Sequence, residues 1–136
     1  MSTMALNNPY AAYQQNAVTT ASPGEVTLML YNGCLKFIKQ ASLAMENKQI
    51  ETKNTNIQKA QKIIRELMLT LNMDLEISKN MSVLYEYMNH RLTEANVKND
   101  RTILTEVEGL VVEFRDTWRQ VIQINRQQQH GQGGQA

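Results

Sequence analysis

The sequence has few of the residues that interrupt helices. Among its 136 residues there are two prolines and six glycines, and three of those glycines lie in the last six positions. Proline lacks an amide hydrogen, and glycine inside a helix costs about 1 kcal/mol relative to alanine. Because the body of the chain is almost free of both, we expect long helices. The length suits one domain with a core of its own.

Cysteine and long apolar runs are also scarce. The single cysteine, Cys34, excludes an internal disulfide and suits a reducing compartment. No stretch approaches the roughly 18 apolar residues that span a membrane. The N-terminus shows no basic start followed by an apolar run, so a signal peptide is not expected. These features predict a cytoplasmic protein without membrane insertion.

Clusters of one charge sign are missing as well. The net charge is +1, and basic and acidic residues alternate along the chain. A surface for nucleic acid needs grouped Lys and Arg, so nucleic acid is not expected as a partner. Residues 1–24 carry no charged side chain at all, and this segment contains Tyr10 and Tyr13.

What the sequence does contain is apolar residues at helical spacing. Ser22-Pro23-Gly24-Glu25 is typical of a helix start, with Ser22 as cap and Glu25 reaching back to the Ser22 amide. The spacing predicts helices over residues 23–46, 51–72, 79–96 and 100–125. Connections this short force consecutive helices to lie antiparallel.

The predicted fold is therefore all-α, an antiparallel up-down-up-down four-helix bundle formed by residues 22–125. Residues 1–21 are expected to form an N-terminal cap segment, with a short helical piece packed on the bundle. Residues 126–136 are rich in Gln and Gly, and they predict a flexible tail.

Few residues could support catalysis or metal binding. Di-iron bundles use Glu-x-x-His pairs, and the sequence has none. Glu86 and His90 are four positions apart, a weak signal for two metal ligands and far more typical of a solvated histidine one turn from a carboxylate. His90 also lacks the neighbours of a phosphotransfer histidine, and Cys34 sits among apolar positions as an inert thiol. We predict no enzyme activity, no metal and no cofactor.

The first predicted helix has an unusually wide apolar face. Its main stripe covers about a third of the circumference, and further apolar residues widen the arc to roughly 200°. These further residues are Leu28, Tyr31, Leu35 and Ile38. Two interpretations stay open: this helix is the most central one, or the extra surface is a groove for a partner's amphipathic helix.

The uncharged N-terminal segment is relevant to the second interpretation. Tyr10 and Tyr13 are three positions apart, so one helical turn places both rings on the same side. Each ring has apolar area and a polar tip, which suits packing on an apolar groove. One hypothesis is that this segment covers the groove when it is empty. Deletion of residues 1–18 would then increase the binding of a hydrophobic dye.

Five separated blocks resemble the flagellin-specific export chaperone family (FliS). They are residues 8–14, 22–33, 59–67, 95–100 and 114–118, and they follow the family's order and spacing. The resemblance implies a helical bundle that binds the disordered C-terminal segment of flagellin in the cytoplasm and prevents premature polymerisation. It also implies delivery to a component of the flagellar type III export gate.

The predicted partner-binding residues combine these arguments: they are Tyr10, Tyr13, Leu28, Tyr31 and Leu35. The resemblance implies that the two N-terminal tyrosines cover the groove and assist docking. The alternative is a self-associating helical adaptor that forms a homodimer through the same apolar arc.

Overall fold

The computed structural model describes residues 22–135, with side chains up to residue 128. The described part of the chain consists of four α-helices without strands: α3 (Pro23–Glu46), α4 (Ile50–Leu69), α5 (Glu76–Lys98) and α6 (Arg101–Gln135). The predicted N-terminal helical piece, with Tyr10 and Tyr13, lies outside these residues.

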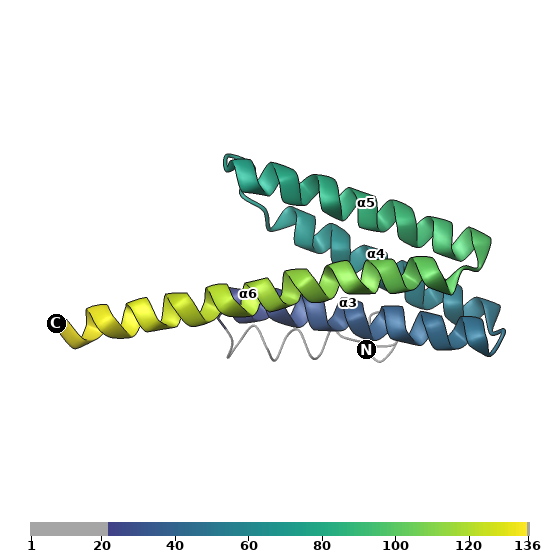
Figure 1. Cartoon of the computed structure of the whole chain (residues 1–136), viewed down its shortest axis with the longest axis horizontal. Coiled ribbons are helices and arrows are strands. Elements are labelled where there is room, and N and C mark those ends of the chain that lie inside the picture. The colour runs from purple at the N-terminus through teal and green to yellow at the C-terminus, as the bar shows by residue number, and fades with distance from the viewer. Residues whose placement is uncertain (1–21, 136) are drawn as a thin grey trace, which may run out of the picture.

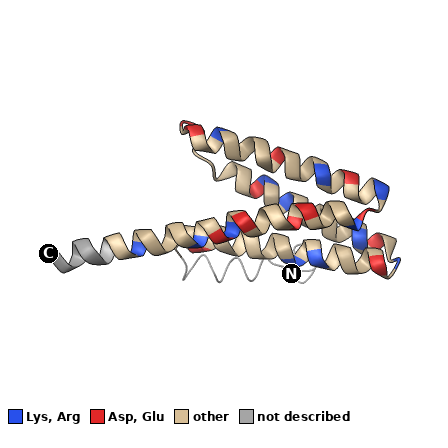
Figure 2. Ribbon diagram, viewed as in Figure 1, with Lys and Arg blue, Asp and Glu red and all other residues tan. Residues whose placement is uncertain are grey.

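The helices form the predicted antiparallel bundle (Figure 1). Each one packs on its neighbour in sequence, and α6 also returns to pack on α3, which closes the ring. Basic and acidic residues are mixed along the helices (Figure 2). The all-α, up-down-up-down prediction is confirmed.

The start of α3 follows the predicted cap in part. The backbone amide of Glu25 donates to Ser22 Oγ over 3.2 Å, and Pro23 occupies the first helical turn. The prediction that the Glu25 carboxylate reaches back to the Ser22 amide is wrong, because this carboxylate pairs with Arg126 of α6. The first turn of α3 is thus joined to a part of α6 that is distant in sequence.

Three helix boundaries differ from the prediction by three residues or more. Helix α4 ends at Leu69, three residues early, and α5 begins at Glu76, three residues early. The largest difference is in α6, which was expected to end at residue 125 and continues to Gln135. No proline follows residue 125, and Arg and Gln have high helix propensity, so the helix continues despite the three glycines near its end.

The core is built from side chains of all four helices. Ile38, Ile64, Leu92 and Val107, one from each helix, are among those removed from solvent. Cys34 is fully buried, as predicted, and burial raises the pKa of its thiol to about 12. At neutral pH the thiol is therefore protonated and unreactive.

Candidate partner-binding groove

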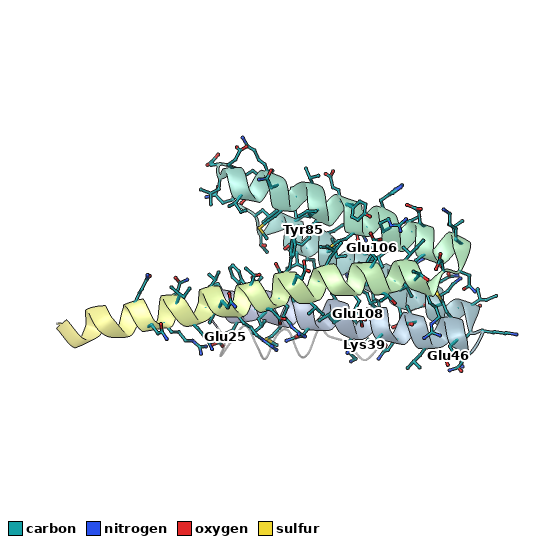
Figure 3. The ribbon with its side chains drawn as sticks, viewed as in Figure 1. Glu25, Lys39, Glu46, Tyr85, Glu106 and Glu108 are labelled. Atoms are coloured by element: carbon teal, nitrogen blue, oxygen red, sulfur yellow. The ribbon has the colours of Figure 1, made fainter. Side chains whose placement is uncertain are left out.

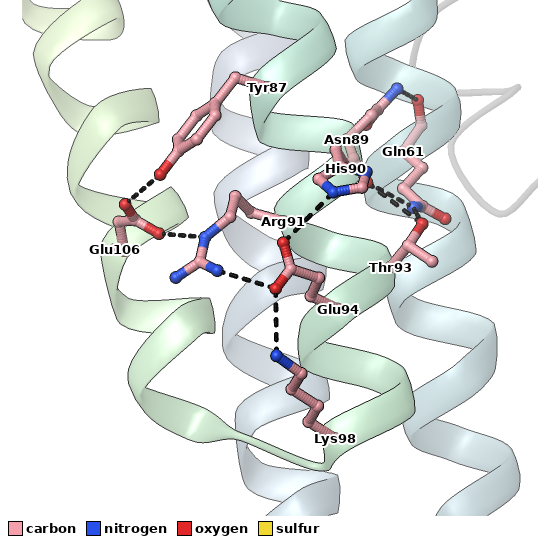
Figure 4. A network of polar contacts seen from close by, with 9 residues as sticks. All are labelled: Gln61, Tyr87, Asn89, His90, Arg91, Thr93, Glu94, Lys98 and Glu106. Atoms are coloured by element: carbon pink, nitrogen blue, oxygen red, sulfur yellow. Dashed lines mark hydrogen bonds and ion pairs between the residues drawn. The ribbon is translucent and has the colours of Figure 1, made fainter.

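One end of the bundle is held closed by polar contacts between α5 and α6 (Figure 4). Glu106 accepts from the Tyr87 hydroxyl over 2.6 Å and from Arg91 Nε over 2.7 Å. Arg91 and Lys98 also pair with Glu94. The hydrogen bonds from Tyr87 and Arg91 lower the pKa of Glu106, so the cluster stays ionised at neutral pH.

The same end is joined to α4 by interlocking amides. Gln61 Nε2 donates to the Asn89 carbonyl over 3.0 Å and to Thr93 Oγ1 over 2.9 Å. Asn89 Nδ2 returns a hydrogen bond to the Gln61 carbonyl over 3.3 Å. Both clusters lie in the second half of α5, which is thereby fixed to both of its neighbours.

The first half of α5 has no such links. Among the described residues, no hydrogen bond or ion pair joins the segment before Tyr85 to another helix. In Figure 1 the α4–α5 hairpin diverges from the α3–α6 pair towards this end. A groove of about 930 Å³ lies there, which we call the open-end groove.

Helices α3, α5 and α6 and the α4–α5 connection line the open-end groove. The described lining residues carry no charge, and most are apolar. The apolar ones include Val26, Leu30, Leu71, Leu75, Ile77, Met81, Trp118, Val121 and Ile122. Several keep large exposed fractions, with Leu75 at 51% and Ile77 at 61%. Exposed apolar area grouped in a concave site is typical of a binding surface.

The wall between α3 and α6 is fixed by specific contacts. Trp118 Nε1 donates to the Gly24 carbonyl over 2.7 Å. A Cβ on Gly24 would lie 3.4 Å from Ile122 Cγ1, so the two helices approach closely here. The Arg126–Glu25 pair lies one turn further along. This wall is therefore rigid, whereas the α5 wall is held from one end only.

Two tyrosines meet at the floor of the groove. The hydroxyl oxygens of Tyr31 on α3 and Tyr85 on α5 are 2.6 Å apart, and both residues line the cavity. The Tyr85 ring points from α5 towards α6 (Figure 3), where it meets Phe114 edge-on with 5.4 Å between ring centroids. Burial raises the pKa of both tyrosines, so both hydroxyls keep their protons.

Three of the residues predicted to bind a partner, Leu28, Tyr31 and Leu35, lie on α3, and one of them lines the groove. Tyr31 and Leu35 are 2% and 5% exposed, so neither side chain presents exposed apolar surface in this structure. Their side chains are buried because α3 packs on both α4 and α6. Tyr31 still lines the floor of the open-end groove, whereas Leu28, which is half-buried, and Leu35 do not.

The histidine seen in the sequence is also placed differently. His90 Nε2 lies 3.4 Å from Glu94, not beside Glu86, and the imidazole is exposed. In the described residues, no group of three or more His, Cys, Asp or Glu side chains could hold a metal ion. None of the helices is both long and apolar enough to cross a membrane, within the described chain.

Sequence reasoning missed most of the groove, although one signal was present. The connection expected at residues 73–78 contains Met73, Leu75 and Ile77, and three large apolar residues are unusual in so short a loop. All three are exposed, and the last two line the groove. The contribution of Trp118 and Val121 could not be seen, because they continue the core stripe of α6 without a break.

Comparison with known proteins identifies the family. The model of the flagellar protein FliS family matches residues 6–125, which is nearly the whole chain. The chain belongs to the FliS family. The FliS flagellar secretion chaperone of Bacillus subtilis is 59% identical over 131 residues, covering 96% of this chain and 98% of the relative.

More distant FliS relatives and a solved structure agree. The FliS flagellar secretion chaperone of Salmonella typhimurium is 36% identical over 110 residues, covering 79% of this chain and 82% of the relative. A crystal structure of a bacterial flagellar chaperone superposes with a TM-score of 0.69. It covers 85% of this chain and 95% of its own at 18% identity, and so supports the fold alone.

Proposed function

We propose that this FliS-family chain is a cytoplasmic chaperone that binds the disordered C-terminal segment of flagellin in the open-end groove. Binding there prevents premature polymerisation, and the complex is delivered to the flagellar type III export gate. The observation that carries the proposal is the uncharged, apolar groove with exposed Leu75 and Ile77 on its wall. The names of the relatives, flagellar secretion chaperones, support the class of partner.

The size of the groove fits a helical occupant. The α5 wall from Ile77 to Tyr85 spans about 12 Å at 1.5 Å per residue, or roughly two helical turns. An amphipathic helix of that length can lay an apolar face on the groove. Ordering it costs about 1–2 kcal/mol per residue, and each fully buried apolar side chain returns about 1.5–3 kcal/mol. Several anchors are therefore required, and the groove provides them from α3, α5, α6 and the α4–α5 connection.

The residues outside the described range enter the same proposal. Tyr10 and Tyr13 cover the groove when it is empty, and they assist docking when flagellin binds. Of the remaining predicted residues, Tyr31 contributes through the groove floor, and Leu28 and Leu35 support α3 beside it. The function is binding, and no catalysed reaction is part of it.

The test compares flagellin with flagellin that lacks its C-terminal segment, by titration calorimetry. We expect binding to the full-length protein and none to the truncated one. Equal binding to both, or binding to neither, would contradict the proposal. If flagellin does not bind and the chain sediments as a dimer, the self-associating adaptor is the better description.

A matched pair of variants tests the location. Val121 lines the groove and is 36% exposed, whereas Val97 is 80% exposed at the far end of α5. Val121→Asp places a charge in the apolar site and should abolish binding, and Val97→Asp should leave it unchanged. Because both positions are exposed, both variants should fold, which circular dichroism checks. Unchanged binding by Val121→Asp would show that flagellin binds outside the open-end groove.

A further inference from the structure

The two tyrosine hydroxyls at the groove floor carry one proton more than their mutual hydrogen bond requires. The hydroxyl oxygens of Tyr31 and Tyr85 are 2.6 Å apart, and either can donate to the other. Two hydroxyls carry two protons, and the hydrogen bond between them uses only one. Neither hydroxyl makes another hydrogen bond to the described residues. The second proton therefore needs an acceptor from outside the bundle.

The other polar side chains around the groove do not supply that acceptor. The hydroxyls of Thr27 and Thr70 donate to carbonyls of their own helices, Pro23 and Leu67. The Tyr85 ring is packed on Phe114, and the remaining surroundings of the pair are mainly apolar. In the free protein, water in the groove can accept the proton. A partner that displaces this water must replace its hydrogen bond.

A second hydroxyl lies on the same line of α5. Ser78 is 5% exposed and lines the groove, and its hydroxyl makes no hydrogen bond to a described residue. It precedes Tyr85 by seven residues, so two turns of helix place both on one side, about 10 Å apart. The apolar wall thus has two polar points at the spacing of a helical repeat.

We propose that the Tyr31–Tyr85 pair selects a partner helix that presents a neutral side-chain acceptor, the oxygen of Asn, Gln, Ser or Thr, at the groove floor. A second polar side chain, about seven residues away in the partner, faces Ser78. The acceptor comes from a side chain because the backbone carbonyls of a helical partner are already bonded within it. A neutral group fits because the groove has no charge to compensate a buried carboxylate.

This proposal rests on the proposed function and gives the groove its specificity. An apolar groove alone discriminates weakly between apolar helices that differ by a methylene group. A site that hydrogen-bonds its ligand rejects ligands lacking the polar group, because its own donor is then buried without a partner. The pair would thus favour the correct segment over other exposed apolar helices in the cell.

The test removes the hydroxyls without changing the shape of the floor. The double variant Tyr31→Phe/Tyr85→Phe should bind the flagellin C-terminal segment roughly tenfold more weakly, since the buried acceptor of the partner is left unmatched. Each single variant should lose less, because the remaining hydroxyl can turn its proton to the partner. Tyr87→Phe is the matched control. Tyr87 lies on the same helix outside the groove lining, so loss of its hydroxyl should not change the affinity for the flagellin segment.

A partner-side scan makes the test specific for the hydrogen bond. Each Asn, Gln, Ser and Thr of the flagellin segment is replaced by Ala, and each peptide is titrated against both proteins. One position should weaken binding to the natural chain and have no effect on the double variant. If the double variant does not fold, Tyr85→Phe takes its place in the same scan. Equal affinity of the natural and hydroxyl-free proteins, or no such position, would overturn the proposal.

The outcomes separate this inference from the proposed function. If the natural chain binds flagellin and Val121→Asp abolishes binding, while the double Phe variant binds normally, the groove is the site and only the selection rule fails. If the natural chain does not bind flagellin, both proposals fail together.

Discussion

The groove makes a quantitative prediction at Ile77. This side chain is 61% exposed at the start of α5 and lines the open-end groove. Ile77→Ala removes three carbon groups, and each contributes about 0.8 kcal/mol when it passes from water to an apolar site. Since about three fifths of the side chain is exposed before binding, the loss is roughly 1.5 kcal/mol. That corresponds to about tenfold weaker binding of flagellin.

The matched control is Val83→Ala. Val83 is 66% exposed on the same helix, and it does not line the groove. Its truncation should leave the affinity for flagellin unchanged. If Val83 were buried against flagellin, the same truncation would weaken binding about fivefold. Both positions are exposed, so both variants should stay within about 0.5 kcal/mol of the natural stability.

Titration calorimetry with the flagellin C-terminal segment measures both variants against the natural chain. Urea unfolding of the free proteins confirms that any loss comes from binding and not from the fold. Equal losses at the two positions would show that the whole outer face of α5 contacts flagellin. No loss at Ile77 would refute the groove as the binding site.

Three further predictions concern the bundle itself. Burial holds the pKa of Cys34 at about 12 against 9.0 for the free thiol, so its contribution to stability is complete below pH 9 and is lost as pH rises through 12. The melting temperature should fall over this range, and less steeply in Cys34→Ala; parallel falls would contradict this. Lys53 Nζ donates to the Asn96 carbonyl over 3.1 Å and to Asn99 Oδ1 over 3.2 Å at the C-terminus of α5. Lys53→Met should lower the unfolding free energy by about 2 kcal/mol in urea denaturation, and an unchanged midpoint would argue against the cap. A Cβ on exposed Gly109 would meet nothing within 4 Å, so Gly109→Ala should stabilise α6 by about 1 kcal/mol, seen as a higher melting temperature.

The local features of the fold could be predicted because local chemistry decides them. Ser22 and Pro23 define the start of α3, and its predicted end at Glu46 is also confirmed. Here Asn47 follows the last apolar turn, and Lys48 adopts a positive φ of 59° that ends the helix. The predicted end of α6 is wrong because the Gln-rich and Gly-rich composition indicated a tail, whereas the helix continues through these glycines with no proline to interrupt it.

The groove could not be predicted because it depends on which contacts are missing. Periodicity gives the angular width of the apolar face of α3, but it does not say what covers that face. Tyr31 and Leu35 are buried on a helix that packs on both α4 and α6. The exposed apolar surface lies instead where α5 separates from α6. This separation occurs at the start of α5 because the polar contacts of Glu106 and Gln61 hold only its second half.

The same placement explains why the groove stays open in the free protein. Closing α5 onto α6 at this end would bury Ile77 and Val121, which favours closure by the hydrophobic effect. It would also remove water from the Ser78 hydroxyl and from the unused proton of the Tyr31–Tyr85 pair, neither of which has an acceptor in the described chain. Each unmatched donor costs about 1–3 kcal/mol when buried, which is comparable to the gain from one apolar side chain. A partner that brings acceptors as well as apolar groups avoids this cost. The polar points at the floor therefore oppose collapse of the groove and select its occupant by the same hydrogen bonds.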